Sequence, residues 1–120
     1  MQTHTRAMIA ACAYAAITGK KVAGLYDHSA ARDLDIAAEC RENRVQGIDG
    51  ERAAKFGGTL PEIRDDADQT FVSLVVDGSK ASGFDRGSQG HYLAEVTGQV
   101  IQIYDYADAA WFAFETRNFG

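Results

Sequence analysis

Four aspartates in similar sequence surroundings constrain the fold of this 120-residue chain more than any other feature. Aligning the sequence on them without gaps puts a large apolar or aromatic residue directly before each one and another seven positions after it. A unit that recurs in this way predicts an internal repeat. The aspartates are Asp27, Asp49, Asp85 and Asp105; Tyr26, Ile48, Phe84 and Tyr104 precede them, and Leu34, Phe56, Tyr92 and Phe112 follow them.

Each copy of the repeat predicts a β-hairpin whose loop begins with aspartate. A carboxylate suits that position because it accepts hydrogen bonds from backbone N–H groups two residues further along. A single hairpin is marginal in water, so the copies must bury their apolar faces against each other. We therefore expect a mainly β (α+β) fold, with an N-terminal helix followed by four antiparallel hairpins in a pseudo-four-fold or barrel-like arrangement. The hairpins are expected at about 20–40, 43–60, 79–97 and 99–116.

Short apolar or alternating runs bounded by Asp, Gly, Ser and Asn predict the individual strands. The clearest hairpin joins FVSLVV to KASGF through Asp77 and Gly78, since glycine tolerates the positive φ of a tight turn. The polar segment PEIRDDADQ, residues 61–69, is expected to be a long loop. The predicted strands are 20–26, 33–40, 43–48, 53–58, 70–76, 79–84, 91–97, 99–104 and 110–116.

The alanine-rich segment 3–18 predicts a helix because alanine has the highest helix propensity. Thr3 or Thr5 suits its start and Gly19 its end. The apolar stretch before Cys12 is shorter than the roughly 7 to 15 residues of a secretory signal, so we interpret the segment as a helix rather than a signal. Small residues along one side predict that this helix packs on the sheet or fills one end of the ring.

Composition limits the partners and the compartment. A hydrophobic content of 46% supports one core, and hence a single domain over residues 1–120. The net charge of -5 argues against nucleic acid or an anionic membrane surface as the partner. Cys12 and Cys40 lack metal-ligand spacing and fit thiols in a reducing compartment, which predicts a cytoplasmic location and leaves a disulfide unsupported. No motif implies a cofactor.

A family resemblance rests on the repeated YD and GxD hairpins in LYDHSAARDLDIAAE, RVQGIDG and YDYADAAWFAFE. These phrases resemble small uncharacterised bacterial proteins of the four-fold β-flower type, over roughly residues 20 to 116. The resemblance implies a pseudo-four-fold ring of hairpins. It includes no catalytic signature, so it assigns no functional residue.

The loops of hairpins that surround an axis gather at one end, and this end is the candidate binding surface. Its aspartates either cap their own loops or together bind a hard cation such as Ca²⁺ or Mg²⁺, which prefers oxygen ligands. The loops lack the DxDxDG spacing of a dedicated calcium site, which favours the capping role. Aromatic neighbours suit contact with a small ligand, a sugar or a protein. The candidate ligand-binding residues are Asp27, Asp49, Asp85, Asp105, Tyr26, Tyr104 and Trp111.

The loop DHSAARDLD adds a hydrolytic alternative through His28, Ser29 and Asp33. Adjacency in sequence does not build a catalytic triad, and no GxSxG elbow accompanies these residues, so a solvated, salt-bridged loop is favoured. We expect a non-enzymatic domain that acts by binding or self-assembly through the loop end, with a homo-oligomer or a protein partner. Binding of a metal or small ligand by the loop aspartates, and hydrolysis, stay open as alternatives.

Overall fold

The computed structural model describes residues 1–117, which form one helix and eleven strands. This confirms the expectation of a mainly β fold with an N-terminal helix. Within these residues no helix combines the length and hydrophobicity needed to cross a bilayer. The elements are α1 (Thr3–Thr18), β1 (Val22–Asp27), β2 (Arg32–Arg41), β3 (Arg44–Asp49), β4 (Ala54–Thr59), β5 (Glu62–Asp65), β6 (Thr70–Ser73), β7 (Val75–Asp77), β8 (Lys80–Asp85), β9 (Gly90–Thr97), β10 (Val100–Asp105) and β11 (Ala110–Thr116).

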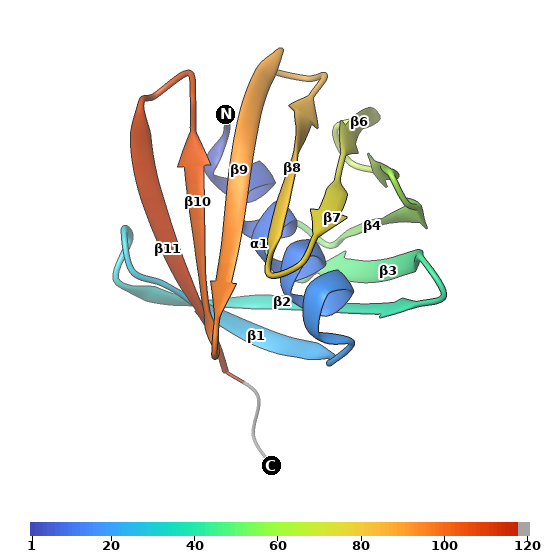
Figure 1. Ribbon diagram of the computed structural model, residues 1–120, viewed down its shortest axis with the longest axis horizontal. Coiled ribbons are helices and arrows are strands. Elements are labelled where there is room, and N and C mark those ends of the chain that lie inside the picture. Colours follow the sequence, from blue (N-terminus) through green and yellow to red (C-terminus); the bar gives the residue numbers. More distant parts are fainter. Residues whose placement is uncertain (118–120) are drawn as a thin grey trace.

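The strands form an antiparallel barrel in which strands that follow one another in the chain are neighbours (Figure 1). Strand β1 pairs with β11, which joins the two ends of the strand sequence. Strand β6 pairs with β5 on one side and, through Val72 opposite Asp85, with β8 on the other. Strand β7 follows β6 after Leu74 and pairs only with β8, so the other ten strands form the closed wall.

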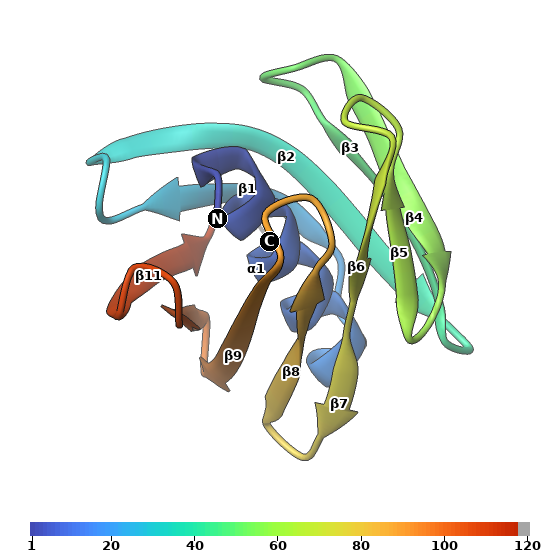
Figure 2. The ribbon, with the colours of Figure 1, turned by 90° about the horizontal axis from the view of Figure 1, so that it is seen from above.

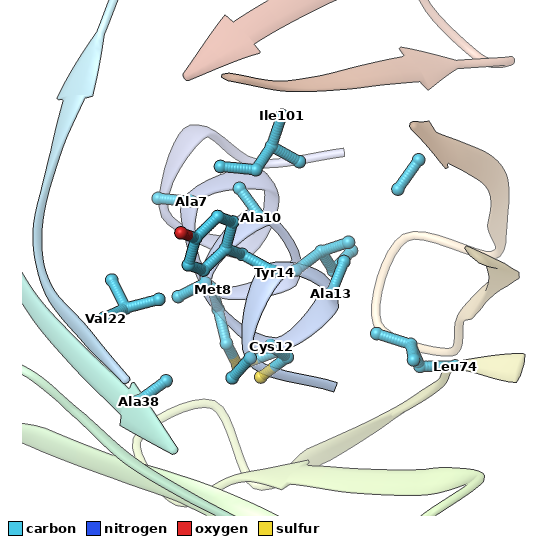
Figure 3. Close-up of a cluster of buried hydrophobic side chains, with 14 of the residues drawn as sticks. Ala7, Met8, Ala10, Cys12, Ala13, Tyr14, Val22, Ala38, Leu74 and Ile101 are labelled. Carbon is cyan, nitrogen blue, oxygen red and sulfur yellow. The ribbon is translucent and has the colours of Figure 1, made fainter. Parts of the chain in front are cut away.

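Helix α1 lies inside this wall, as the view from above shows (Figure 2). Every residue from Thr5 to Ala15 is buried, so the helix has no exposed face along this stretch. A helix that is apolar around its whole circumference belongs in a core. In Figure 3, Ala7, Ala10 and Ala13 alternate with the larger Met8, Cys12 and Tyr14 among side chains of the wall. The sequence left open whether the helix packs on a sheet or fills the ring, and its burial on all sides corresponds to the second arrangement.

The ends of α1 differ in how well the sequence predicts them. Gly19 follows the helix in the left-handed conformation, with φ at 71°, and its N–H donates to the carbonyl of Ala15, as the C-cap prediction requires. At the other end, Gln2 precedes the helix and no side chain caps it. Thr3 and Thr5 lie within the helix, so their predicted capping role is wrong.

Five hairpins bend at an aspartate: β1–β2, β3–β4, β5–β6, β8–β9 and β10–β11. The additional copy begins at Asp65, within the segment 61–69 that was wrongly predicted to be one long loop. In every copy the fourth residue after the aspartate has a positive φ, between 51° and 57°. The pseudo-four-fold arrangement stays a prediction that these five matching bends do not support. The left-handed residues are Ala31, Ala53, Gln69, Gln89 and Ala109.

All five bends lie at the same end of the barrel, which we call the bend end, because successive strands run in opposite directions. Helix α1 begins at this end, where Arg6 contacts Asp105 and His4 contacts Asp68. The start of the helix therefore lies among the carboxylates of the bends. Negative charge near a helix N-terminus is favourable because the helix dipole is positive there.

Candidate functional site

The bend aspartates point into the barrel, and each is at most 3% exposed. In each copy, Oδ1 accepts the backbone N–H of the residue two positions later, at 2.9–3.1 Å. This is the loop-capping geometry considered in the sequence analysis. The pairs are Asp27 with Ser29, Asp49 with Glu51, Asp65 with Ala67, Asp85 with Gly87, and Asp105 with Ala107.

Each bend is also bonded to the neighbouring hairpin. The residue directly after the aspartate donates its N–H to a backbone carbonyl next door, at 2.7–3.2 Å. These bonds fix the bends relative to one another around the barrel, so groups that point inward from different bends keep a constant spacing. The donor–acceptor pairs are His28–Ala113, Gly50–Asp35, Asp66–Lys55, Arg86–Phe71 and Tyr106–His91.

Two arginines form ion pairs with three of the bend carboxylates. Arg52 donates from Nε to Asp49 Oδ2 and from Nη2 to Asp65 Oδ2, both at 2.8 Å. Burial alone would lower the pKa of Arg52, but its hydrogen bonds and attraction to these two carboxylates raise it above the usual value. Arg52 therefore keeps its charge and joins two neighbouring hairpins.

Asp105 is paired from the helix. Arg6 Nη1 and the amino group of Met1 each lie 3.2 Å from Asp105 Oδ2. Burial alone would raise the pKa of this carboxyl, but the hydrogen bond and charge of the Met1 amino group, with backbone N–H groups of Asp108 and Ala107, hold it below the usual value. Asp105 is therefore ionised and fixes the start of α1 to the wall.

The other two bend carboxylates, Asp27 and Asp85, have no cationic partner within residues 1–117. Asp85 accepts the N–H of Gly87 at 3.0 Å and the hydroxyl of Ser88 at 2.7 Å. It faces a pocket of about 350 Å³ between the start of α1 and the β8–β9 bend, which we call the Asp85 pocket. Its polar lining residues are Gln2, Thr5, Asp68, Thr70, Asp85 and Ser88.

Thr5 is the unusual member of this lining. The residue as a whole is only 5% exposed, and no group within residues 1–117 forms a hydrogen bond with its hydroxyl, which opens toward the pocket and is not fully enclosed. The Asp85 pocket therefore contains a donor–acceptor group that the protein itself leaves unused.

The alternative of a metal centre built from the four repeat aspartates is not what the structure brings together. Within the described chain, the group of His, Cys, Asp and Glu side chains close enough to share one ion is His4, Asp65 and Asp68. Asp27, Asp49, Asp85 and Asp105 are held apart on separate hairpins, each by its own loop. Coordination of one ion by these four carboxylates is therefore wrong.

The hydrolytic candidates are not brought together either. His28 Nε2 lies 3.2 Å from Glu115 Oε1, and Asp33 Oδ1 accepts from Arg117 Nε at 3.1 Å. Ser29 contributes its backbone N–H to Asp27. His28 and Asp33 thus bind partners on or after β11 instead of each other, which matches the solvated, salt-bridged loop favoured from the sequence.

The aromatic candidates lie on the outer surface, whereas the aspartates point inward. The Tyr104 ring contacts Trp111 and Tyr106, with centroids 5.2 Å and 4.9 Å away, and Trp111 is 50% exposed. Phe112 points the other way, toward Arg6 on the helix. Tyr26 packs against His28 and Arg117 on another part of the wall. The sequence predicted one surface that carries both the aspartates and the aromatic residues. In the structure they lie on two separate surfaces, an interior polar pocket and an exterior aromatic face.

Sequence reasoning missed Thr5, Arg52, Asp65 and Asp68. A signal for the last two was present, because Asp65-Asp66-Ala67-Asp68 matches Asp105-Tyr106-Ala107-Asp108 in three of four positions. No sequence signal identified Thr5, since its role depends on the helix lying inside the barrel.

Comparison of the chain with protein-family models, curated proteins and solved structures found no match. The resemblance to four-fold β-flower proteins therefore stays a prediction.

Proposed function

We propose that this chain is a non-enzymatic binding protein that holds a small hydrogen-bond-donating ligand in the Asp85 pocket. The observation that carries this proposal is the buried carboxylate of Asp85, which no cation of residues 1–117 pairs and which faces the same pocket as the Thr5 hydroxyl and Asp68. A volume of about 350 Å³ is at the lower end of the range for small-molecule sites.

The lining determines the class of ligand. Carboxylates and hydroxyls supply mainly acceptors, and no lysine or arginine of residues 1–117 lines the pocket. An anionic ligand would meet like charge, whereas ammonium or hydroxyl groups would supply the donors that Asp85 and Asp68 accept. We therefore assign a small amine or a neutral polyol. Both cysteines are free, which supports a cytoplasmic location for this function.

The test uses spermidine and myo-inositol as probes, with inositol hexakisphosphate as the anionic comparison. Isothermal titration calorimetry and amide chemical shifts of Thr5, Gly87 and Ser88 should report binding of an uncharged or cationic probe and none of the anion. Thr5→Val, which keeps the shape and removes the hydroxyl, should weaken binding about tenfold, equivalent to one hydrogen bond. Asp85→Asn should weaken the binding of spermidine more strongly than the binding of myo-inositol.

Thr116 supplies a matched control. Its hydroxyl is fully buried and has no hydrogen-bond partner within residues 1–117, but Thr116 lies outside the lining of the Asp85 pocket. Thr116→Val should leave binding unchanged. If no probe moves the pocket amides, or if Thr5→Val and Thr116→Val behave alike, the proposal is wrong.

The exterior aromatic face supports a second candidate function, self-assembly. This face lies on the outer side of strands β8 to β11 and the loops between them, and it carries no formal charge when His91 is neutral. It consists of Phe84, His91, Tyr104, Tyr106 and Trp111. For a chain of net charge -5, a neutral face is where a second copy meets least repulsion.

Light scattering between low and high micromolar concentration tests this. Self-assembly predicts a mass above 13.0 kDa that Trp111→Ser returns to the monomer value, while Ile48→Ser, at an exposed apolar position on β3, has no effect. A monomer mass at every concentration would exclude self-assembly.

A further inference from the structure

A histidine and two aspartates converge beside the Asp85 pocket. His4 lies in the first turn of α1, Asp65 at the end of β5, and Asp68 in the bend that follows. His4 Nε2 and Asp68 Oδ2 are 2.7 Å apart, and one ligand atom from each of the three residues lies within 4.8 Å of the others. The three side chains thus come from the helix and the wall and meet at one point.

The charge around this point is not balanced by the protein. Arg52 is within ion-pair distance of Asp49, Asp65 and Asp68, so one positive charge faces three carboxylates. When His4 is counted as neutral, the one positive charge of Arg52 and the three negative charges of its carboxylate partners give a formal charge of −2. The positive end of the helix dipole, about half a charge, offsets only part of it. One divalent cation would neutralise the group.

We propose that His4, Asp65 and Asp68 bind one divalent transition-metal ion of the Zn²⁺ type. Imidazole nitrogen with carboxylate oxygen is a ligand set for Zn²⁺, whereas Ca²⁺ and Mg²⁺ take oxygen ligands. Bonds of about 2.0–2.2 Å require the ligand atoms to surround the ion, and the present separations need only side-chain rotation. His4 and Asp68 can rotate because their side chains are 28% and 34% exposed.

Two further observations favour an ion here. Asp65 is 1% exposed and already oriented by the N–H of Ala67 and the guanidinium of Arg52, so one ligand is held in place before metal arrives. Asp68 also lines the Asp85 pocket, so solvent in that pocket can reach the side of the proposed ion that Asp68 faces. The metal site does not rest on the proposed ligand of the pocket.

The experiment adds metal alone to untagged, chelator-treated protein. Titration with ZnCl₂ should give one ion per chain, and CoCl₂ should produce the visible absorption of a tetrahedral or five-coordinate site. His4→Ala and Asp68→Asn should each weaken Zn²⁺ binding at least tenfold. His28→Ala is the matched control, because His28 also pairs with a carboxylate, Glu115, on the surface. It should bind Zn²⁺ like the unaltered chain, and CaCl₂ should produce no binding.

A readout on the unaltered chain covers the case in which a variant fails to fold. On addition of Zn²⁺, the imidazole NMR signals of His4 should shift before those of His28 and His91. Equal shifts of all three, unaltered binding by a folded His4→Ala chain, or no binding of Zn²⁺ overturns the proposal. If Zn²⁺ does not bind, the metal site is excluded. The ligand titrations use metal-free protein and the Thr5→Val chain, so they test the proposed function independently of that result.

Discussion

The aromatic ring of Phe56 occupies the space where a side chain of Gly47 would lie. The two residues face each other across β3 and β4, and a Cβ added to Gly47 would be 2.3 Å from the ring. Gly83 and Tyr92 repeat this relationship in the β8–β9 hairpin, where the added Cβ would be 2.8 Å from the Tyr92 hydroxyl. In these two hairpins a large aromatic side chain seven residues after the aspartate thus faces a glycine two residues before it, whereas the β1–β2 and β10–β11 hairpins pair Leu34 with Leu25 and Phe112 with Ile103.

Replacing Gly47 should therefore destabilise the fold. Gly47→Ala also brings a Cβ to 2.6 Å from the carbonyl oxygen of Ala37, so strain cannot be relieved by Phe56 alone. We expect the free energy of unfolding to fall by about 2–3 kcal/mol, in the range for overpacked cores. Urea denaturation measures it. Gly90→Ala is the control, because its Cβ would meet nothing closer than 3.4 Å and should cost little. Equal losses in both variants would contradict the packing argument.

Removing Arg52 should cost more than removing an exposed arginine. Arg52→Gln leaves Asp49 and Asp65 buried without a cation, and breaking such pairs costs about 3–5 kcal/mol. Arg32→Gln removes the surface pair with Glu51 and should change stability by less than about 1 kcal/mol. Thermal denaturation of both variants at one pH checks this difference. Similar melting temperatures of the two variants would mean that the Arg52 ion pairs stabilise the fold no more than the surface pair of Arg32 does.

The ion pairs of Asp105 should make the free energy of unfolding fall as the pH is lowered into the acid range. Its folded-state pKa lies below the unfolded value of about 3.9, so its contribution is complete above that value and is lost as pH falls through the folded pKa. Asp105→Asn should lower the free energy of unfolding at pH 7, and the difference from the unaltered chain should shrink below about pH 4. Denaturation curves between pH 2 and pH 7 measure this. A constant difference over that range would show that the charge of Asp105 is not responsible.

Asp27 should behave differently because it caps its bend and no cation in the described part of the chain pairs with it. Its Oδ1 accepts the N–H groups of Ser29 and Ala30, at 2.9 Å and 3.2 Å. An asparagine oxygen can accept the same bonds, so Asp27→Asn should cost less than about 1 kcal/mol, whereas Asp27→Ala should cost about 1–3 kcal/mol. Urea denaturation of the pair distinguishes them. If asparagine is as harmful as alanine, the charge at Asp27 matters and the capping explanation is insufficient.

The sequence predicted the bends well because each is specified locally. An aspartate that caps its own loop, followed by a strand, needs no information from the rest of the chain. The copy at Asp65 was missed because Arg64 stands where the other copies have an apolar or aromatic residue. That position points outward, where an arginine is as acceptable as a tyrosine, so the pattern relied on a position that the core does not constrain.

The candidate site could not be predicted in the same way because it depends on where α1 lies. The alanine-rich segment gives a helix in any environment, but only a closed wall makes Thr5 a pocket residue and places His4 beside Asp68. The split between inward aspartates and outward aromatics follows from strand alternation. It separates Asp105 from its neighbour Tyr104, although adjacency in the sequence suggested one shared surface.

The joint between β6 and β8 has a consequence for motion. Only Val72 and Asp85 pair there, whereas the other joints of the wall have at least two paired positions. Local opening of a protein begins where the fewest backbone bonds must break. The Arg86 N–H bond to the Phe71 carbonyl and the Tyr92 hydroxyl bond to the Ser73 carbonyl also cross this joint, and we expect local opening of the wall to begin here, next to the bend that carries Asp85.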